Sequence, residues 1–176
     1  MTKKYNLALI PISKTNEIVT LARKFVDIAD KYLLGDKSLP HVTLYQFHAE
    51  EKEIAEIWKQ VCKGWEAKPI DLAFNKFSCI TSDNTIFLVS LLPNNHEILH
   101  KMHGFIANIL QLPIKKTFDP HMSLMSTKKQ DYEQEVAKLS DSYKPIVDKF
   151  ILMLGVSDNI GQLTNIIYRC DEEKHL

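Results

Sequence analysis

Two short stretches of the chain carry the same spacing of a histidine and a hydroxyl. The first reads PHVTL and contains His41 and Thr43; the second, eighty residues further on, reads PHMSL and contains His121 and Ser123. An imidazole titrates near neutral pH, so one histidine can take a proton from water while the other gives a proton to a leaving alkoxide. Each hydroxyl can donate a hydrogen bond to an oxygen on which negative charge develops. Brought together, the two pairs would be suited to cleave a phosphoester without a metal ion or a cofactor.

Each motif is predicted to lie on a β-strand, because its residues are rich in β-formers and the proline before each histidine favours extended backbone. Side chains alternate faces along a strand, so residues i and i+2 point the same way. We therefore expect His41, Thr43 and Tyr45 on one face of the first strand, and His121 and Ser123 on one face of the second. The residues between them are expected to face the core: Val42, Leu44, Met122 and Leu124.

The recurrence of the motif decides how it is interpreted. A single histidine on a strand is more often a structural or surface residue than a catalyst. Here the complete pattern of proline, histidine, serine or threonine, and leucine occurs twice in one chain of ordinary composition. Chance repetition of that pattern is rare, so we interpret the pair as functional.

The elements that must hold the two motifs follow an order that repeats along the chain. Apolar runs, helical spacing of apolar residues and turn signals mark them. The expected elements are a strand over 5–12, a helix over 18–32 closed by Gly35, a strand over 41–47, a helix over 54–61 ended by Gly64, strands over 69–80 and 85–92 joined by a turn at 82–84, a helix over 95–110, a strand at 121, a helix over 127–142, and strands over 146–156 and 161–170 around a turn at 157–161. Strand, helix, motif strand, helix and two strands are thus followed by helix, motif strand, helix and two strands.

This repeat predicts an α+β fold in a single domain over residues 1–176. The fold would be bilobal, with two pseudo-symmetric lobes that each have an antiparallel sheet and flanking helices. If the lobes pack about a pseudo-twofold axis, the two imidazoles face each other across a central cleft.

Composition limits the partners and the cellular location. The 22 basic and 22 acidic residues balance, so no global positive field would concentrate a long polyanion. If a nucleic acid is the partner, we expect a small nucleotide or a short RNA, and we expect a monomeric protein with no obligate protein partner. No apolar run approaches the roughly 20 residues of a membrane span. The three cysteines, Cys62, Cys79 and Cys170, lack metal-like spacing and fit structural roles in a reducing compartment, so we expect a cytoplasmic protein without membrane association.

The motifs PHVTL and PHMSL, about half a chain apart in this order of elements, resemble the two-histidine phosphoesterase superfamily, which includes 2′-5′ RNA ligase-like proteins and cyclic phosphodiesterases. The resemblance implies a two-lobed fold with a central groove and metal-independent phosphodiester cleavage. It also implies catalytic roles for His41, Thr43, His121 and Ser123, with His121 activating water and His41 protonating the leaving oxygen. The expected substrate is a 2′,3′-cyclic phosphate of RNA or of a small nucleotide.

One departure from the family concerns charge beside the second motif. Many relatives with RNA substrates have an arginine there, whereas this chain has Asp119 and Met125 as neighbours. Lys115 and Lys116 can supply positive charge instead, and we select Lys116 as a substrate-binding candidate, although a solvated Lys-Lys pair is the simpler interpretation. Two aromatic residues complete the expected substrate site: Tyr45 and Phe118, which could stack on a base, a core role being the alternative for Phe118.

A rival motif, HEILH at residues 96–100, matches a zinc-protease pattern. His103 follows nearby, but on a helical wheel the histidines lie along one flank of the buried stripe and beyond, and the third ligand position of the extended pattern is Ile106. We therefore expect a solvated helix face and no metal. Three alternatives to a cyclic phosphodiesterase stay open: cleavage of 2′-5′ linkages, a non-catalytic nucleotide-binding module, and a metalloprotease that chelators would inhibit.

Overall fold

The computed structural model describes residues 1–34, 38–65, 68–81 and 84–171. In chain order, its elements are β1 (Thr2–Pro11), α1 (Thr15–Arg23), β2 (Lys31–Tyr32), β3 (Val42–Glu50), a 3-10 turn η1 (Glu51–Glu53), α2 (Ile54–Trp65), β4 (Ile70–Thr81), β5 (Phe87–Pro93), α3 (His96–Leu110), β6 (Met122–Thr127), α4 (Tyr132–Ser142), β7 (Ile146–Ser157) and β8 (Leu163–Arg169). The α+β class and the repeated order of elements are confirmed.

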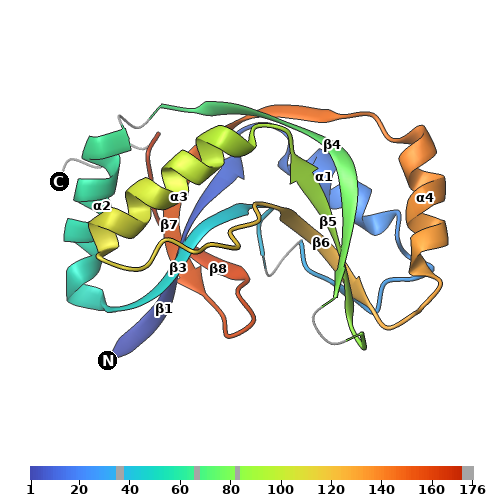
Figure 1. The fold of residues 1–176 in the computed structure, drawn as a ribbon, viewed down its shortest axis with the longest axis horizontal. Coiled ribbons are helices and arrows are strands. Elements are labelled where there is room, and N and C mark those ends of the chain that lie inside the picture. Colours follow the sequence, from blue (N-terminus) through green and yellow to red (C-terminus); the bar gives the residue numbers. More distant parts are fainter. Residues whose placement is uncertain (35–37, 66–67, 82–83, 172–176) are drawn as a thin grey trace.

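The described strands form one antiparallel sheet in the order β2-β6-β5-β4-β7-β1-β3, with β8 paired to β7. The long strands β4 and β7 run along the top of Figure 1 and join the two ends of the molecule. The first part of β7, residues 146–150, pairs with β4, and its last part, residues 153–157, pairs with β8. A continuous sheet does not by itself establish the predicted division into two lobes, which stays a prediction.

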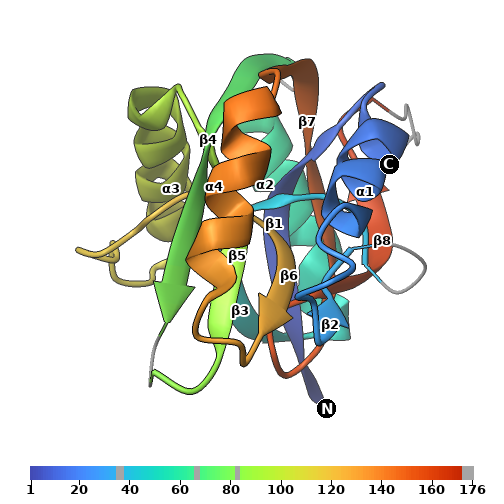
Figure 2. The ribbon, with the colours of Figure 1, turned by 90° about the vertical axis from the view of Figure 1, so that its right-hand side faces the viewer.

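Each end of the sheet is covered by helices from both halves of the sequence. At one end α2 contacts α3, and α3 contacts β3; at the other α1 contacts β6, and α4 contacts β4 (Figures 1 and 2). Each motif strand is therefore packed against a helix from the opposite half of the chain. Each half of the sequence thus contributes one helix to each end of the sheet.

The sheet is apolar on both faces at β1, which lies between β7 and β3. Tyr5, Leu7 and Leu9 belong to the main core beneath the helices. Ala8 and Ile10 face the other way and pack in a second cluster with residues of β7 and β8. A strand buried on both faces appears as an unbroken apolar run rather than an alternating one, as the sequence LALI at residues 7–10 does.

Two predicted helices have different limits in the structure. The helix expected over 18–32 ends at Arg23, and Tyr32 lies instead in β2, opposite Met125 of β6. The apolar spacing continued because Phe25 and Ile28 are buried, but they sit in turns whose backbone bonds span three residues. The proposed cap Gly35 lies outside the described residues. The helix expected over 127–142 begins at Tyr132, and Thr127 ends β6.

Gly64 and the turn expected at 82–84 are the remaining predicted ends of elements. Gly64 lies inside α2 rather than after it, and a Cβ there would come 2.1 Å from the Phe105 ring. The glycine therefore permits the close approach of α2 to α3. Of the turn expected at 82–84, residues 82 and 83 lie outside the described part, while Asn84 has a positive φ of 58°. None of the described helices is long and apolar enough to span a membrane.

Candidate active site

The two motifs line one cavity of about 540 Å³. His41, Thr43, His121 and Ser123 all contribute to its wall. A smaller cavity of about 180 Å³ shares Thr43, His121 and Lys115 with it. The sequence prediction that these four side chains gather around one space therefore agrees with the geometry.

A β-bulge follows each motif at the same position. In the pairing of β3 with β1, Thr43 lies opposite Ala8 and Tyr45 opposite Leu7, so Leu44 is an extra residue. In the pairing of β6 with β5, the same irregularity makes Leu124 the extra residue between Ser123 and Met125. A bulge breaks the alternation of side chains beyond it.

The bulges overturn the prediction for Tyr45. Beyond Leu44 the alternation is reversed, so Tyr45 turns into the core, where it is 4% exposed, instead of sharing the face of His41. Its hydroxyl donates to the Pro113 carbonyl (2.8 Å), and its ring stacks on His103. Tyr45 therefore cannot stack on a base in this structure.

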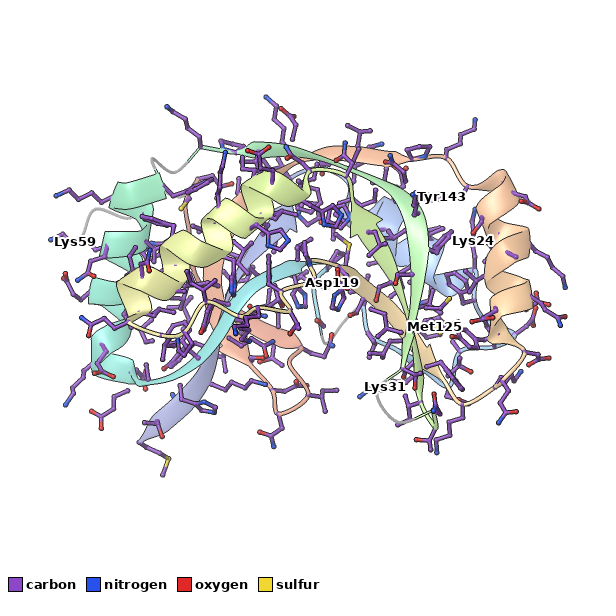
Figure 3. The ribbon with its side chains drawn as sticks, viewed as in Figure 1. Lys24, Lys31, Lys59, Asp119, Met125 and Tyr143 are labelled. Carbon is purple, nitrogen blue, oxygen red and sulfur yellow. The ribbon has the colours of Figure 1, made fainter. Side chains whose placement is uncertain are left out.

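The same reversal also turns toward the cavity two residues that regular alternation would place on the opposite face of the sheet. Gln46 follows the first bulge and Ser126 the second, and both line the main cavity. Lys31 joins them because the short strand β2 pairs with β6; Figure 3 labels Lys31 and, on β6, Met125. Gln162 comes from the β7–β8 hairpin. Gln46 and Ser126 each lie five residues after a motif histidine, and this shared spacing is the sequence signal that could have identified them as cavity residues.

Both catalytic candidates among the histidines are oriented by the same type of hydrogen bond. Nδ1 of His41 lies 2.7 Å from the Leu39 carbonyl, and Nδ1 of His121 lies 2.8 Å from the Asp119 carbonyl. A carbonyl only accepts, so in each ring Nδ1 carries the proton and donates it. Nε2 is left for a ligand: as an acceptor when the ring is neutral and as a donor when it is charged.

The environments of the two histidines differ. His41 is 7% exposed, and His121 is half-buried. Burial lowers the pKa of His41 below its ordinary value of 6.5; the bond to the Leu39 carbonyl opposes this shift, and the nearby charge of His121 adds to it. At neutral pH, His41 is therefore held in its neutral form, with a free lone pair on Nε2.

The hydroxyl of Thr43 is also oriented from beneath. Asn6 of β1, fully buried, donates from Nδ2 to Thr43 Oγ1 at 3.0 Å. Because Oγ1 accepts this bond, its own proton is available for an oxygen in the cavity. At the second motif, the register partner of Ser123 is Ser90, which is fully buried and whose Oγ has no hydrogen-bond partner among the described residues.

The remaining substrate-site candidates are placed differently from each other. Phe118 is half-buried and lines the smaller cavity, with one face of its ring stacked on His103. Lys116 is exposed and lines neither cavity. Its neighbour Lys115 lines both cavities, with Nζ 5.1 Å from the centre of the Tyr45 ring. Of the two lysines, Lys115 lies at these two cavities and Lys116 does not, and substrate binding by Lys116 stays a prediction.

The HEILH segment forms the first turns of α3. His96 and His100 are exposed, as expected, and Glu97 pairs with Lys101 at 2.6 Å. His103 contradicts the expected solvated face, because it is only 1% exposed. Within the described part of the chain, no three histidine, cysteine, aspartate or glutamate side chains are grouped so as to hold a metal ion.

Two of the three cysteines meet. Sγ of Cys62 in α2 lies 2.9 Å from Sγ of Cys170, which follows β8, and both are free thiols. Cys79 in β4 is a separate thiol whose pKa is raised, chiefly by burial. None of the three lines the cavity that holds the motifs.

Comparison with solved structures identifies the fold. The crystal structure of Escherichia coli LigT in its apo form has a TM-score of 0.61 at 9% identity, covering 96% of this chain and 96% of that chain. LigT complexed with 3′-AMP has a TM-score of 0.58 at 8% identity, with 96% of each chain covered. Kluyveromyces marxianus Usb1 with uridine monophosphate has a TM-score of 0.55 at 14% identity, covering 94% of this chain and 96% of that chain. These proteins share the fold of this chain.

Sequence comparison identifies the family. No curated protein matches the chain. The model of the 2′-5′ RNA ligase superfamily matches residues 18–152, which are most of the chain and include both histidine motifs. The chain therefore belongs to the 2′-5′ RNA ligase superfamily of two-histidine phosphoesterases.

Proposed function

We propose that this protein is a metal-independent phosphodiesterase that hydrolyses a 2′,3′-cyclic phosphate of RNA or of a small nucleotide. Membership of the superfamily supports a phosphodiesterase-type enzyme. The observation that carries the finer proposal is that two imidazoles and two hydroxyls line one cavity, with both Nε2 atoms left available by the bonds at Nδ1. These groups supply a base, an acid and hydrogen-bond donors from the protein alone.

The lowered pKa of His41 favours His41 as the base, the reverse of the roles implied by the family resemblance. Neutral His41 accepts a proton from water at Nε2 as the water oxygen attacks phosphorus. Charged His121 donates its Nε2 proton to the ribose oxygen as the P–O bond breaks. The product is a phosphate monoester with one free hydroxyl, and solvent then returns the two imidazoles to their starting forms.

The hydroxyls of Thr43 and Ser123 are proposed to donate to the non-bridging oxygens of the phosphate. Charge on those oxygens grows in the transition state, where a preoriented donor is most effective. Asn6 already directs the Thr43 proton away from the β1 strand. Lys115, the cation that lines both cavities, would balance the remaining negative charge.

The size and lining of the cavities support a nucleotide as substrate. About 540 Å³ lies within the ordinary range for small-molecule sites. Its apolar side includes Leu33, Ile86 and Leu88, which can cover a base. LigT and Usb1, which share the fold, have structures with 3′-AMP and with uridine monophosphate, respectively. The ligand expected is a small nucleotide or a short RNA, bound by a cytoplasmic monomer without an obligate protein partner.

A 2′-5′ linked oligonucleotide is a second candidate substrate, favoured by one observation. Thr43 and His121 line the smaller cavity as well as the main one, so two spaces border the motif residues and could each take one side of an internal linkage. A cyclic phosphate at the end of a chain needs only one side, whereas an internal linkage needs both. A non-catalytic binding module remains the alternative from another class, and it has no use for two oriented titratable groups.

The test is hydrolysis of an oligoribonucleotide that ends in a 2′,3′-cyclic phosphate, with EDTA present throughout. The parent protein is compared with His41→Ala and His121→Ala, and His96→Ala serves as a control for loss of an exposed histidine. We expect turnover that survives EDTA, is unchanged in the control and disappears in both motif variants. Loss of turnover on chelation would refute metal independence, and a folded but inactive parent would direct the test to 2′-5′ oligoadenylate.

A further inference from the structure

His103 is a buried titratable group that the proposed reaction does not use. It lies on α3, is 1% exposed and does not line either cavity. Its Nδ1 lies 2.8 Å from the Leu44 carbonyl, and its Nε2 accepts the Lys115 backbone N–H at 3.1 Å. A carbonyl only accepts and a backbone N–H only donates, so both bonds require one tautomer: the neutral ring with its proton on Nδ1.

The ring of His103 is held between two aromatic rings. Tyr45 stacks on it with centroids 5.1 Å apart at 16°, and Phe118 stacks on it with centroids 4.2 Å apart at 8°. Tyr45 also donates its hydroxyl to the Pro113 carbonyl. The segment from Pro113 to Phe118 is thereby fastened at three points to His103 and to its stacking partner.

The partners of His103 belong to the surroundings of both motifs. Leu44 is the bulge residue directly after Thr43. Lys115 lines both cavities, and Phe118 precedes Asp119, whose carbonyl orients His121. In Figure 3 Asp119 lies at the centre of the molecule, between the two ends. One imidazole thus bridges the bulge of the first motif and the segment that leads to the second.

The sheet itself gives no direct connection between the motifs. In the strand order, β5, β4, β7 and β1 separate β6 from β3. A shift of one motif relative to the other would misplace a hydroxyl or an Nε2 atom by enough to weaken catalysis, since productive geometry is narrow. The two motifs therefore require a contact outside the sheet that fixes their positions relative to each other.

We propose that His103 is a positioning residue, whose neutral imidazole holds Lys115 and the approach to His121 in register with Thr43. Its effect on turnover rests on the proposed function, whereas its effect on the Lys115 segment does not. His103 acts through its partners and makes no contact with the substrate.

The variant His103→Phe isolates the bridge from the packing. Phenylalanine keeps a flat ring between Tyr45 and Phe118 but removes both hydrogen bonds, leaving the Leu44 carbonyl and the Lys115 N–H unpaired. His103→Gln restores a donor and an acceptor on one side chain. His96→Gln, at an exposed position of the same helix, is the matched control.

The first measurement is hydrogen exchange of the Lys115 amide, followed by NMR. In the parent and in His96→Gln we expect this exposed residue to have a protected amide, because His103 Nε2 accepts it. In His103→Phe the amide should exchange at least tenfold faster, and in His103→Gln protection should partly return. Equal exchange in the parent and in His103→Phe would overturn the proposal, whatever the activity.

The second measurement is turnover on the cyclic phosphate. His103→Phe should lower kcat/KM about tenfold or more, with the melting temperature followed in parallel, and His103→Gln should recover part of it. If the bridge acts through Lys115, Lys115→Ala should lower the rate less in His103→Phe than in the parent. Equal losses in the two backgrounds would show a merely structural role. If His103→Phe does not fold, exchange in the parent and in His103→Gln still decides. A parent that is inactive on the cyclic phosphate would move the activity test to 2′-5′ oligoadenylate, and Lys115 exchange would again decide on His103.

Discussion

The hydrogen bond from Asn6 to Thr43 provides a sharp test of how the hydroxyl works. Asn6 is fully buried, and its Nδ2 lies 3.0 Å from Thr43 Oγ1. Replacing it by alanine leaves the hydroxyl in place but free to rotate. The change Asn6→Ala therefore removes the direction of the donor, whereas Thr43→Val removes the donor itself.

The magnitudes expected of the two changes differ by more than tenfold. A neutral hydrogen bond contributes about 0.5–1.5 kcal/mol, and each 1.36 kcal/mol in a barrier is tenfold in rate. Asn6→Ala should thus lower kcat by about 2- to 10-fold. Thr43→Val should lower kcat by about 10²- to 10³-fold, as expected for loss of one donor to a developing oxyanion.

The assay is kcat on the cyclic phosphate for both single variants and the double variant, with Thr43→Ser to restore a hydroxyl. Asn94→Ala is the control for loss of an asparagine side-chain bond away from the cavity, because Asn94 Oδ1 accepts the Ala73 N–H. If Asn6 acts only by directing Thr43, the double variant equals Thr43→Val. A double variant that shows the full product of both losses would refute the reasoning.

Three further predictions concern the site and its frame. With His41 as the base, activity is lost as pH falls through the lowered pKa of His41, so the acidic limb of kcat/KM should lie below pH 6.5. A profile in which kcat/KM instead declines as pH rises from below 6.5 would assign His41 as the acid. Gly155→Ala should lower the melting temperature by roughly 2–12 °C, because its Cβ would come 2.3 Å from the Asn165 carbonyl oxygen of β8, an overpacking that costs about 1–3 kcal/mol. Ala73→Gly in β4 is the control for a substitution in a strand, and an unchanged melting temperature of Gly155→Ala would contradict the contact. Oxidised glutathione should convert Cys62 and Cys170 into a disulfide, which releases two molecules of reduced glutathione and raises the melting temperature by up to about 10 °C. The melting temperature of Cys170→Ser should not change, and a free-thiol count that stays at three in the parent would disprove the pairing.

The pairing of each motif histidine with a hydroxyl could be predicted from the sequence, because it depends only on residues that are close together in the chain. A histidine and a hydroxyl two residues apart on a strand share a face whatever the rest of the fold does. His41 with Thr43, and His121 with Ser123, therefore line one cavity as predicted. The order of elements was equally accessible, because each element has its own apolar pattern.

Alternation failed where the register between strands is irregular. The bulges at Leu44 and Leu124 depend on how β1 and β5 pair with the motif strands, and neither motif carries a local mark of them. That is why Tyr45 was expected beside His41, and why Gln46 and Ser126 were missed.

Long-range packing accounts for the other differences. His103 lies on the flank of an amphipathic helix, and its burial follows from Tyr45 and Phe118, which come from distant segments. Tyr32 likewise leaves the helical pattern because an open edge of β6 is available for pairing. Tertiary contacts of this kind override local propensity.

The most direct test of the central claim compares two leaving groups. A nucleotide 4-nitrophenyl phosphodiester releases nitrophenolate, which needs no proton, whereas ring opening of the 2′,3′-cyclic phosphate releases an alkoxide that does. If His41 is the base and His121 the acid, His121→Ala should be nearly inactive on the cyclic phosphate but recover a large part of parental activity on the nitrophenyl ester, and His41→Ala should be impaired on both. Recovery by His41→Ala instead would reverse the two roles, and equal impairment of both variants on both substrates would contradict paired acid and base catalysis.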